Sequence, residues 1–286
     1  MTVIHEEFAG LLVAIWPQMD FGCPESRAPT YGRASAGDRA NLCDVSVVVA
    51  CLGSSSTAGQ GQAFGWIDEL AGRPQNARYS FKNLGVGGDF AYDALQRLPA
   101  VIATQPDRVV VLIGANDVLA MVFPNVRRLL GGFMKHLPRD PAVEWFKENL
   151  EAIVTHLKAD TDATIGLSSL GPIGEAPDSN DPHQRRLNDL VTQFSGIIKQ
   201  TAAANGLAYI PFYERLSEQI AASPGRALTR FRFLPLYRDT FRFFVLRKSS
   251  DDIAAANGWR FHVDGVHLNR RGGMILAGLV QGFLDA

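Results

Sequence analysis

Short runs of β-branched residues alternate with longer stretches of helical periodicity along most of this chain. This alternation is typical of consecutive βαβ units, in which parallel strands form a sheet that is buried on both faces. The expected strands span residues 45–52, 80–84, 108–113, 164–168 and 207–210. The sequence therefore predicts an α/β fold, a three-layer α/β/α sandwich with a mainly parallel central sheet.

The segments between the expected strands carry apolar residues at helical spacing, which gives each helix one stripe for packing on the sheet. Two such stripes consist of Val143, Phe146, Leu150, Ile153, Val154 and Leu157, and of Leu187, Leu190, Val191, Phe194, Ile197 and Ile198. A last helix is expected to begin near Asn269 and to pack through Met274, Ile275, Leu279 and Val280.

The composition and net charge of the whole chain limit the kinds of molecule that the protein is expected to bind. With 47% hydrophobic residues and a formal net charge of -1 over 286 residues, the chain is typical of a globular protein and has no global field that would attract nucleic acid. We therefore expect a small-molecule partner. An apolar run over residues 8–16 follows two glutamates and is too short to cross a bilayer, so no signal peptide or transmembrane helix is expected. A cytoplasmic location is the simplest interpretation, and export stays open.

The three cysteines fit a protein with reduced thiols. Cys51 lies inside the first expected strand, where a free thiol behaves as a small hydrophobic residue. Cys23 and Cys43 could form a disulfide if the protein is exported, and the sequence leaves their pairing open.

Two segments do not follow the α/β pattern. Residues 1–44 precede the first expected strand and are interpreted as an N-terminal extension that packs on a single domain of residues 45–286. Residues 226–248 form an insertion in which arginines alternate with aromatic and aliphatic side chains. The insertion fits a lid over a pocket, a surface for a membrane or another subunit, or a connection whose aromatic residues pack in the core. We favour the last interpretation over a membrane surface, because such stripes mostly serve the core.

Chemically versatile residues gather in a few loops of the predicted sheet. In open parallel sheets, ligands bind beyond the carboxyl ends of the strands, where loops converge and helix N-termini point free N–H groups outward. The loops of interest have the sequences GSSST (53–57), NLGVGGD (83–89), GAND (114–117) and DGVHLN (264–269). Each alone has an ordinary explanation in helix capping or turns. Together they contain the parts of an acyl-transfer site.

Acyl transfer requires a nucleophile, a base and donors for an oxyanion. A serine hydroxyl is a weak nucleophile until a base removes its proton. His267 can be that base, and Asp264, three residues earlier in one turn, can fix the histidine tautomer and stabilise the imidazolium. The charge that develops on the attacked carbonyl oxygen needs aimed donors, such as a backbone N–H at the serine, another at a glycine, and the side-chain amide of Asn116.

The four blocks, in this order, resemble those of the SGNH or GDSL hydrolase family, named for the serine, glycine, asparagine and histidine that its blocks contribute. The resemblance covers roughly residues 45–286, with gaps, and implies a flavodoxin-like fold for a catalytic domain. The first block places the nucleophile at Ser55, and the second, with a glycine just before an aspartate, implies Gly88 as an oxyanion-hole residue. One position departs from the family pattern, because the usual aspartate before the nucleophile is Ser54 here. That aspartate is not the triad acid, so the departure affects only local hydrogen bonding.

The resemblance implies a catalytic triad of Ser55, Asp264 and His267, and an oxyanion hole formed by the N–H groups of Ser55 and Gly88 with the amide of Asn116. The implied reaction is hydrolysis of carboxylic esters through an acyl-enzyme on Ser55, by an esterase, a lipase-like enzyme or an O-deacetylase. No metal or cofactor is needed.

Other functions and roles remain open at this point. A thioesterase or lysophospholipase is an alternative within acyl chemistry, and a non-catalytic carbohydrate- or lipid-binding module on the same fold is an alternative of another class. His262, in an extended stretch before Asp264, is expected to be structural or to lie at the rim of the site. The oligomeric state and the physiological acyl and alcohol groups do not follow from the sequence.

Overall fold

The computed structural model describes residues 46–59, 63–232, 238, 242 and 246–286, which all belong to one compact unit. The expected N-terminal extension and the pairing of Cys23 with Cys43 lie outside the described residues. So do most of the aromatic side chains of the insertion at 226–248.

Five parallel strands form the sheet of the described residues, in the order β2-β1-β3-β4-β5. Their bounds are β1 Val47–Gly53, β2 Tyr79–Gly85, β3 Arg108–Leu112, β4 Thr164–Ser168 and β5 Ala208–Ile210. Every strand expected from the sequence is present, with ends that differ by a residue or two. Alternation of β-branched runs with helical stripes was therefore a sufficient guide to the sheet.

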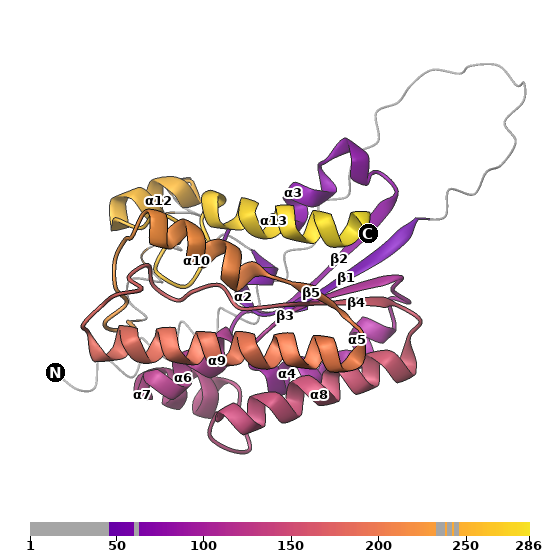
Figure 1. The fold of residues 1–286 in the computed structure, drawn as a ribbon, viewed down its shortest axis with the longest axis horizontal. Helices are drawn as coiled ribbons and strands as arrows, with labels where there is room; N and C mark the ends of the chain where they lie inside the picture. Colours follow the sequence, from indigo (N-terminus) through magenta and orange to yellow (C-terminus); the bar gives the residue numbers. More distant parts are fainter. Residues whose placement is uncertain (1–45, 60–62, 233–237, 239–241, 243–245) are drawn as a thin grey trace, which may run out of the picture. The chain divides into compact units, whose positions relative to one another are not determined.

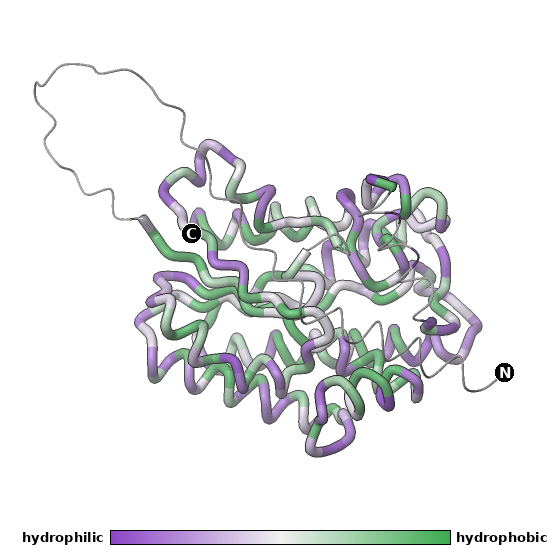
Figure 2. Tube along the Cα trace, turned by 180° about the vertical axis from the view of Figure 1, so that it is seen from behind, coloured by the Kyte–Doolittle hydropathy of each residue, from purple (hydrophilic) through white to green (hydrophobic). Residues whose placement is uncertain are grey.

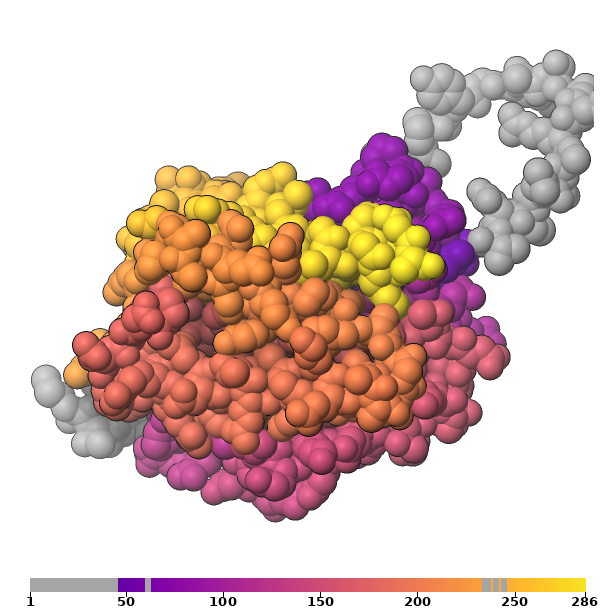
Figure 3. Space-filling view, in the orientation of Figure 1, coloured from indigo at the N-terminus to yellow at the C-terminus, as the bar shows by residue number. Residues whose placement is uncertain are grey.

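Helices cover both faces of this sheet (Figure 1). In chain order they are α2 Ser55–Ala58, α3 Trp66–Ala71, η1 Pro74–Asn76, α4 Ala91–Gln96, α5 Leu98–Ile102, α6 Ala115–Val122, α7 Pro124–Val126, η2 Arg127–Met134, α8 Val143–Asp160, α9 Pro182–Asn205, α10 Phe212–Ala222, α12 Ser250–Asn257 and α13 Arg270–Asp285. Helices α3, α10 and α13 lie on one side, and α4, α5, α8 and α9 lie on the other. The surfaces of α10 and α13 adjoin in the space-filling view (Figure 3). The three-layer α/β/α prediction is confirmed.

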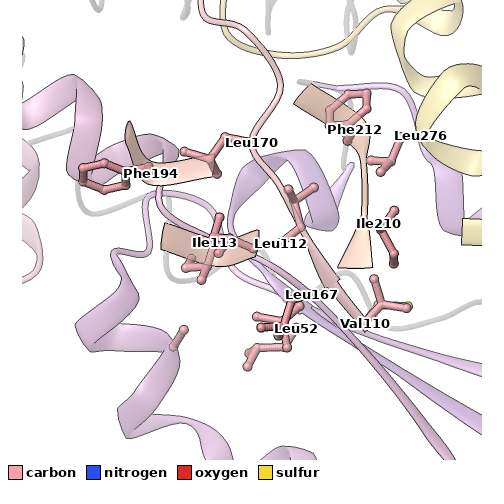
Figure 4. Close-up of a cluster of buried hydrophobic side chains, with 14 of the residues drawn as sticks. Leu52, Val110, Leu112, Ile113, Leu167, Leu170, Phe194, Ile210, Phe212 and Leu276 are labelled. Atoms are coloured by element: carbon pink, nitrogen blue, oxygen red, sulfur yellow. The ribbon is translucent and has the colours of Figure 1, made fainter. Parts of the chain in front are cut away.

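The core lies between the sheet and each helical layer. Strands β1 and β3 are buried on both faces, and Figure 2 shows their course as mostly hydrophobic. In α8 and α9 the predicted stripes are the buried ones, apart from Val143 and Ile197 at their margins. Figure 4 shows side chains of the strands meeting Phe194 of α9, Phe212 of α10 and Leu276 of α13. Cys51 is a buried free thiol in this core, as expected for a small hydrophobic residue.

Helix α13 begins where the sequence indicated, but its buried stripe differs from the expected one. The side chain of Asn269 caps the helix by accepting a hydrogen bond from Gly272 N at 3.1 Å. The buried stripe contains Leu276, Val280 and Leu284, spaced four residues apart. Of the expected residues only Val280 is buried, whereas Met274, Ile275 and Leu279 are half-buried. They lie on the flanks of the stripe, so the sequence prediction was rotated around the helix axis by part of a turn.

The strand order determines which loops meet. Strand β1 lies between β2 and β3, so the loop after β1 is flanked by the loops after its two neighbours. Such a switch point in strand order is where open α/β sheets place their ligand crevice. The loops after β1, β2 and β3 contain the first three sequence blocks singled out above, which the topology therefore brings together.

Candidate active site

The first block forms a tight turn from β1 into the short helix α2. The carbonyl oxygen of Ser54 accepts hydrogen bonds from Thr57 N at 3.0 Å and Ala58 N at 2.9 Å, and Ser55 is the first residue of the helix. A Cβ on Gly53 would lie 2.1 Å from Thr57 Oγ1 and 2.5 Å from the carbonyl oxygen of Leu112. Only glycine therefore lets the strand turn into the helix here, and Ser55 is left half-exposed at the turn.

The departure from the family pattern at Ser54 is accommodated inside the protein. Ser54 is 3% exposed and its side chain makes no capping hydrogen bond with α2, so helix capping does not explain this serine. It lines a cavity of about 30 Å³ together with Pro172 and His262. A cavity of this size holds about one water molecule.

Ser55, His267 and Asp264 lie in one hydrogen-bonded line. The Oγ atom of Ser55 is 2.9 Å from Nε2 of His267, and Nδ1 of His267 is 2.7 Å from Oδ2 of Asp264. Ser55 and His267 are 212 residues apart in the sequence. The predicted nucleophile, base and acid are thus in contact, in the order that proton transfer from serine to histidine requires.

A short turn holds the histidine in place. Asp264 Oδ1 accepts hydrogen bonds from Val266 N and His267 N, both at 2.9 Å. Gly265 has a φ of 95°, and a Cβ there would lie 2.6 Å from the ring of Trp259. The turn therefore needs glycine for its conformation and for the space. On either side of it, Val263 N donates to His267 O at 2.7 Å and Asn269 N donates to Phe261 O at 3.0 Å, which closes a small hairpin.

The contact between Asp264 and His267 sets the charge of both side chains. Burial alone would raise the pKa of Asp264, but the charge and hydrogen bonds of His267 outweigh it and lower that pKa. Burial alone would lower the pKa of His267, but the carboxylate of Asp264 outweighs it and raises that pKa. Asp264 therefore stays ionised and makes His267 a stronger base than a free imidazole.

The other two predicted residues lie on the loops that flank Ser55. Gly88 has a φ of 81° in the loop after β2, whose first residue, Val86, donates its N–H to the carbonyl oxygen of Gly53 at 3.1 Å. At the far end of this loop, the carbonyl oxygen of Asp89 accepts a hydrogen bond from Asn116 Nδ2 at 2.8 Å. The loop is thus tied both to the turn of Ser55 and to Asn116. One N–H of the Asn116 amide is used in this way, which leaves its second N–H for another acceptor.

An ionic cluster also holds the loop after β2 in place. The side chain of Asp89 is 1% exposed, and it accepts hydrogen bonds from Lys135 Nζ at 2.5 Å and Arg97 Nε at 2.7 Å. Arg97 also donates to the carbonyl oxygens of Leu84 at 3.0 Å and Gly53 at 3.3 Å, which joins the ends of β1 and β2. Sequence reasoning did not identify Arg97 or Lys135.

Sequence reasoning also missed Glu175. This carboxylate lies in the loop after β4 and accepts hydrogen bonds from the backbone N–H groups of Arg260, Phe261 and His262. It also contacts Nδ1 of His262 at 2.9 Å. His262 is 0% exposed, so it is structural, one of its two expected roles, and does not lie at the rim. A single glutamate in a loop carries no sequence signal of such a role.

Within the described residues, no group of three His, Cys, Asp or Glu side chains is arranged to hold a metal ion. None of the helices described is long and apolar enough to span a membrane.

A hydrogen-bonded serine–histidine–aspartate line at the switch point of a parallel sheet defines a serine hydrolase. Residues 51–273 match the GDSL-like Lipase/Acylhydrolase family. Because this match extends over more than half of the chain, the protein belongs to that family. It is accordingly a carboxylic-ester hydrolase that acts on a small-molecule ester. Comparison with curated proteins gives no match.

Solved structures with the same fold include several esterases. An acetylxylan esterase from Geobacillus stearothermophilus is 19% identical with a TM-score of 0.57, over 85% of this chain and 97% of that one. The acetyl xylan esterase AlAXEase is 20% identical with a TM-score of 0.55, over 83% and 100%. A lipase/acylhydrolase from Enterococcus faecalis is 21% identical with a TM-score of 0.52, over 84% and 95%. At these identities the likeness shows a common fold.

Proposed function

We propose that the protein hydrolyses carboxylic esters through an acyl-enzyme on Ser55, with His267 as general base and Asp264 as the group that orients it. The observation that carries this proposal is the unbroken line of hydrogen bonds from Ser55 Oγ through the His267 ring to Asp264. A binding protein has no need for such a line, which favours a catalyst over a non-catalytic module.

The proposed reaction has two similar halves. Ser55 Oγ attacks the ester carbonyl carbon while its proton moves to Nε2 of His267, and the resulting tetrahedral species carries its negative charge on the former carbonyl oxygen. His267 then gives the proton to the leaving alcohol as the carbon–oxygen bond breaks. A water molecule attacks the acyl-enzyme in the same way, passes its proton to His267, and releases the carboxylic acid and Ser55.

Donors for the oxyanion are proposed at three places: the backbone N–H groups of Ser55 and Gly88, and the free N–H of Asn116 Nδ2. Two facts support the proposal. The Gly88 loop is tied to the turn of Ser55, and Asn116 is oriented by its hydrogen bond with Asp89 O. Donors that are fixed before the reaction stabilise the developing charge without reorganisation.

For the substrate, we propose a short acyl group such as acetyl, which the naming of two structural neighbours as acetylxylan esterases supports. Release of p-nitrophenol from esters of increasing acyl length, together with acetate release from acetylated xylose, tests this. A preference for long acyl chains would instead indicate a lipase or lysophospholipase. A partner role for nucleic acid is not proposed, and the cytoplasmic location stays a prediction.

The decisive test of the mechanism compares Ser55→Ala with Ser56→Ala. Ser56 is the neighbouring serine and has no assigned role, so it controls for disturbance of the turn. We expect Ser55→Ala to lose p-nitrophenyl acetate hydrolysis by several orders of magnitude and to lose stoichiometric labelling by a fluorophosphonate. Ser56→Ala should keep both. Wild-type hydrolysis by Ser55→Ala would refute the assignment.

A further inference from the structure

A groove with a volume of about 490 Å³ lies beside the triad and reaches Asp264. One wall is the first part of the insertion, residues 226–232, and the other includes Trp259 and the end of helix α12. Trp259 packs against Gly265, the residue after Asp264. The groove and the triad hairpin are therefore parts of one packed unit.

The charge of this groove contrasts with that of the whole chain, whose net charge is -1. Among the described residues that line it, the charged ones are Arg226, Arg230, Arg232, Arg238 and Asp264. Asp264 is already engaged by His267. Arg230 and Arg232 are exposed, and within the described part of the chain neither forms an ion pair. Among the described residues, four arginines thus line one concave surface together with a single carboxylate, which is already engaged.

The arginines are presented by an anchored backbone. Glu175 exchanges two backbone hydrogen bonds with the start of the segment, from Gly225 N to Glu175 O and from Glu175 N to Arg226 O, both at 2.8 Å. Leu228 N donates to Gln184 Oε1 at 2.6 Å, and Asn125 Nδ2 donates to the carbonyl oxygen of Phe231 at 2.9 Å. Ordering of the loop is therefore not required when a ligand binds, which favours affinity.

Trp259 adds an apolar surface to the groove. It is 9% exposed, and the guanidinium of Arg226 lies 5.5 Å from the centre of its ring. Guanidinium groups bind phosphate and carboxylate oxygens through pairs of parallel hydrogen bonds. A ligand with an anionic group and a less polar part would therefore match both features of the groove.

The position of the groove indicates which part of the ester enters it. In the proposed mechanism His267 protonates the leaving alcohol, so the alcohol lies next to His267. The hairpin of His267 contributes Asp264 to the groove, and Trp259, which packs against Gly265 of this hairpin, lines the groove as well. The oxyanion donors, in contrast, are on the loops after β1, β2 and β3. The groove thus lies on the His267 side of the site, next to Asp264 and opposite the proposed oxyanion donors, which is the side that remains for the alcohol part of the ester.

We propose that this groove binds a phosphate or carboxylate group on the alcohol part of the ester, with Arg230 and Arg232 as its principal ligands. The proposal rests on the proposed function, since that function defines the alcohol side. It names a substrate class: esters of anionic alcohols, such as acylated sugar phosphates, acylated glycerol phosphates or acylated sugar acids.

A matched pair of soluble substrates tests the proposal: monoacetylglycerol and its 3-phosphate, assayed by acetate release. We expect the wild-type KM to be at least about tenfold lower for the phosphate ester, because charged hydrogen bonds contribute more than neutral ones. The double variant Arg230→Ala/Arg232→Ala should lose this preference and keep its kcat/KM for the neutral ester. The control Lys158→Ala/Lys199→Ala removes two exposed charges at the far ends of α8 and α9 and should keep the preference. A preference that survives in the arginine variant would overturn the proposal, and so would equal KM values in the wild type when the vesicle measurement below also shows no arginine-dependent binding.

Two further measurements are needed. The first identifies the source of the anion, and the second distinguishes failure of the groove proposal from failure of the proposed esterase mechanism. Sedimentation with vesicles of phosphatidylglycerol or phosphatidylcholine shows whether the phosphate belongs to a lipid. If the protein binds the anionic vesicles through the arginines but shows no preference among the soluble esters, the bound phosphate belongs to a lipid headgroup. If it prefers the soluble phosphate ester and does not bind the vesicles, the phosphate belongs to a soluble ester. Calorimetric binding of glycerol 3-phosphate to Ser55→Ala needs no catalysis. Arginine-dependent binding there would uphold the groove even if the esterase mechanism failed, and its absence would refute the groove alone.

Discussion

The carboxylate of Glu175 lies 2.9 Å from Nδ1 of His262, and both side chains are fully buried. On its other side, His262 directs Nε2 at the carbonyl oxygen of Pro172, 3.0 Å away. Carbonyl and carboxylate oxygens accept hydrogen bonds, so both ring nitrogens donate and the two side chains form a buried ion pair. Because Glu175 also binds the backbone of residues 260–262, this pair joins the loop after β4 to the hairpin of His267.

Loss of the charge on Glu175 should destabilise the protein strongly. Glu175→Gln leaves the imidazolium of His262 without its partner, and breaking one side of a buried pair costs about 3–5 kcal/mol. Urea unfolding monitored by circular dichroism measures the change. Glu218→Gln, an exposed side chain on helix α10, is the matched control and should change the unfolding free energy by less than about 0.5 kcal/mol. Similar values for the two variants would show that the pair does not stabilise the hairpin.

The same pair predicts sensitivity to acid. Burial alone would raise the pKa of Glu175, but the hydrogen bond and charge of His262 and the backbone N–H groups outweigh it and lower that pKa below the usual 4.5. A lowered pKa means that the stabilisation is complete above 4.5 and is lost as the pH falls through the folded-state value. In a pH series of urea unfolding, the difference between wild type and Glu175→Gln should shrink below pH 4.5. A constant difference would contradict this assignment.

The amide of Asn116 should matter for kcat more than for binding. Asn116→Ala removes one of the proposed oxyanion donors, and the typical loss for such a donor is about 10²- to 10³-fold in kcat. Asn116→Asp has almost the same shape but offers an oxygen where the amide N–H was, so it should be at least as impaired. Steady-state assays with p-nitrophenyl acetate measure both variants, and thermal unfolding controls for the lost hydrogen bond with Asp89 O. A kcat within threefold of wild type in the alanine variant would exclude Asn116 from the oxyanion hole.

Local patterns predicted the parts of the structure that depend on local rules. Strand β4 was predicted at its observed bounds, Thr164–Ser168, because a short segment of this kind between two helical stripes has few alternatives in an α/β fold. Helix α13 was predicted at its start, because Asn269 is a good capping residue, but its buried stripe was misplaced. The packing partner of a helix decides which flank is covered, and no local pattern contains that partner.

The residues of the candidate site also fall into two groups, those that local sequence patterns predict and those that they do not. Ser55, Asp264 and His267 belong to recognisable blocks, and the turn that joins Asp264 to His267 is local. Glu175 acts on residues about 85 positions away, and Arg97 joins strand ends that come together only in the folded sheet. Such supporting residues have no motif, because their role depends on tertiary contacts alone.

The pH dependence of hydrolysis should report the Asp264–His267 contact. The proposed reaction needs neutral His267, whose pKa is raised above 6.5 by Asp264 despite burial, so kcat/KM should rise with pH through a midpoint above 6.5. Asp264→Asn removes the raising charge, so the midpoint should fall, and kcat should drop by up to about 10⁴-fold because the tautomer is no longer fixed. The control is Asp178→Asn, an exposed loop residue that should leave the profile unchanged. An unchanged midpoint in Asp264→Asn would show that another group controls the profile.

Asp117, next to Asn116, should make the protein less stable as the pH rises. This side chain is 1% exposed and accepts a hydrogen bond from Ala91 N at 3.1 Å, and burial raises its pKa from 3.8 to about 7. The folded state therefore holds a proton that the unfolded state releases between about pH 4 and pH 7, so the unfolding free energy falls across this window.

Asp117→Asn keeps an accepting oxygen and has no charge to bury. It should match the wild type near pH 4 and exceed it by about 4 kcal/mol at pH 8. Urea unfolding over this range measures the difference, with Asp140→Asn, an exposed residue, as control. Parallel curves for wild type and Asp117→Asn would mean that Asp117 is ionised in the folded state, with its charge stabilised by the backbone N–H groups at the start of α4 and α6.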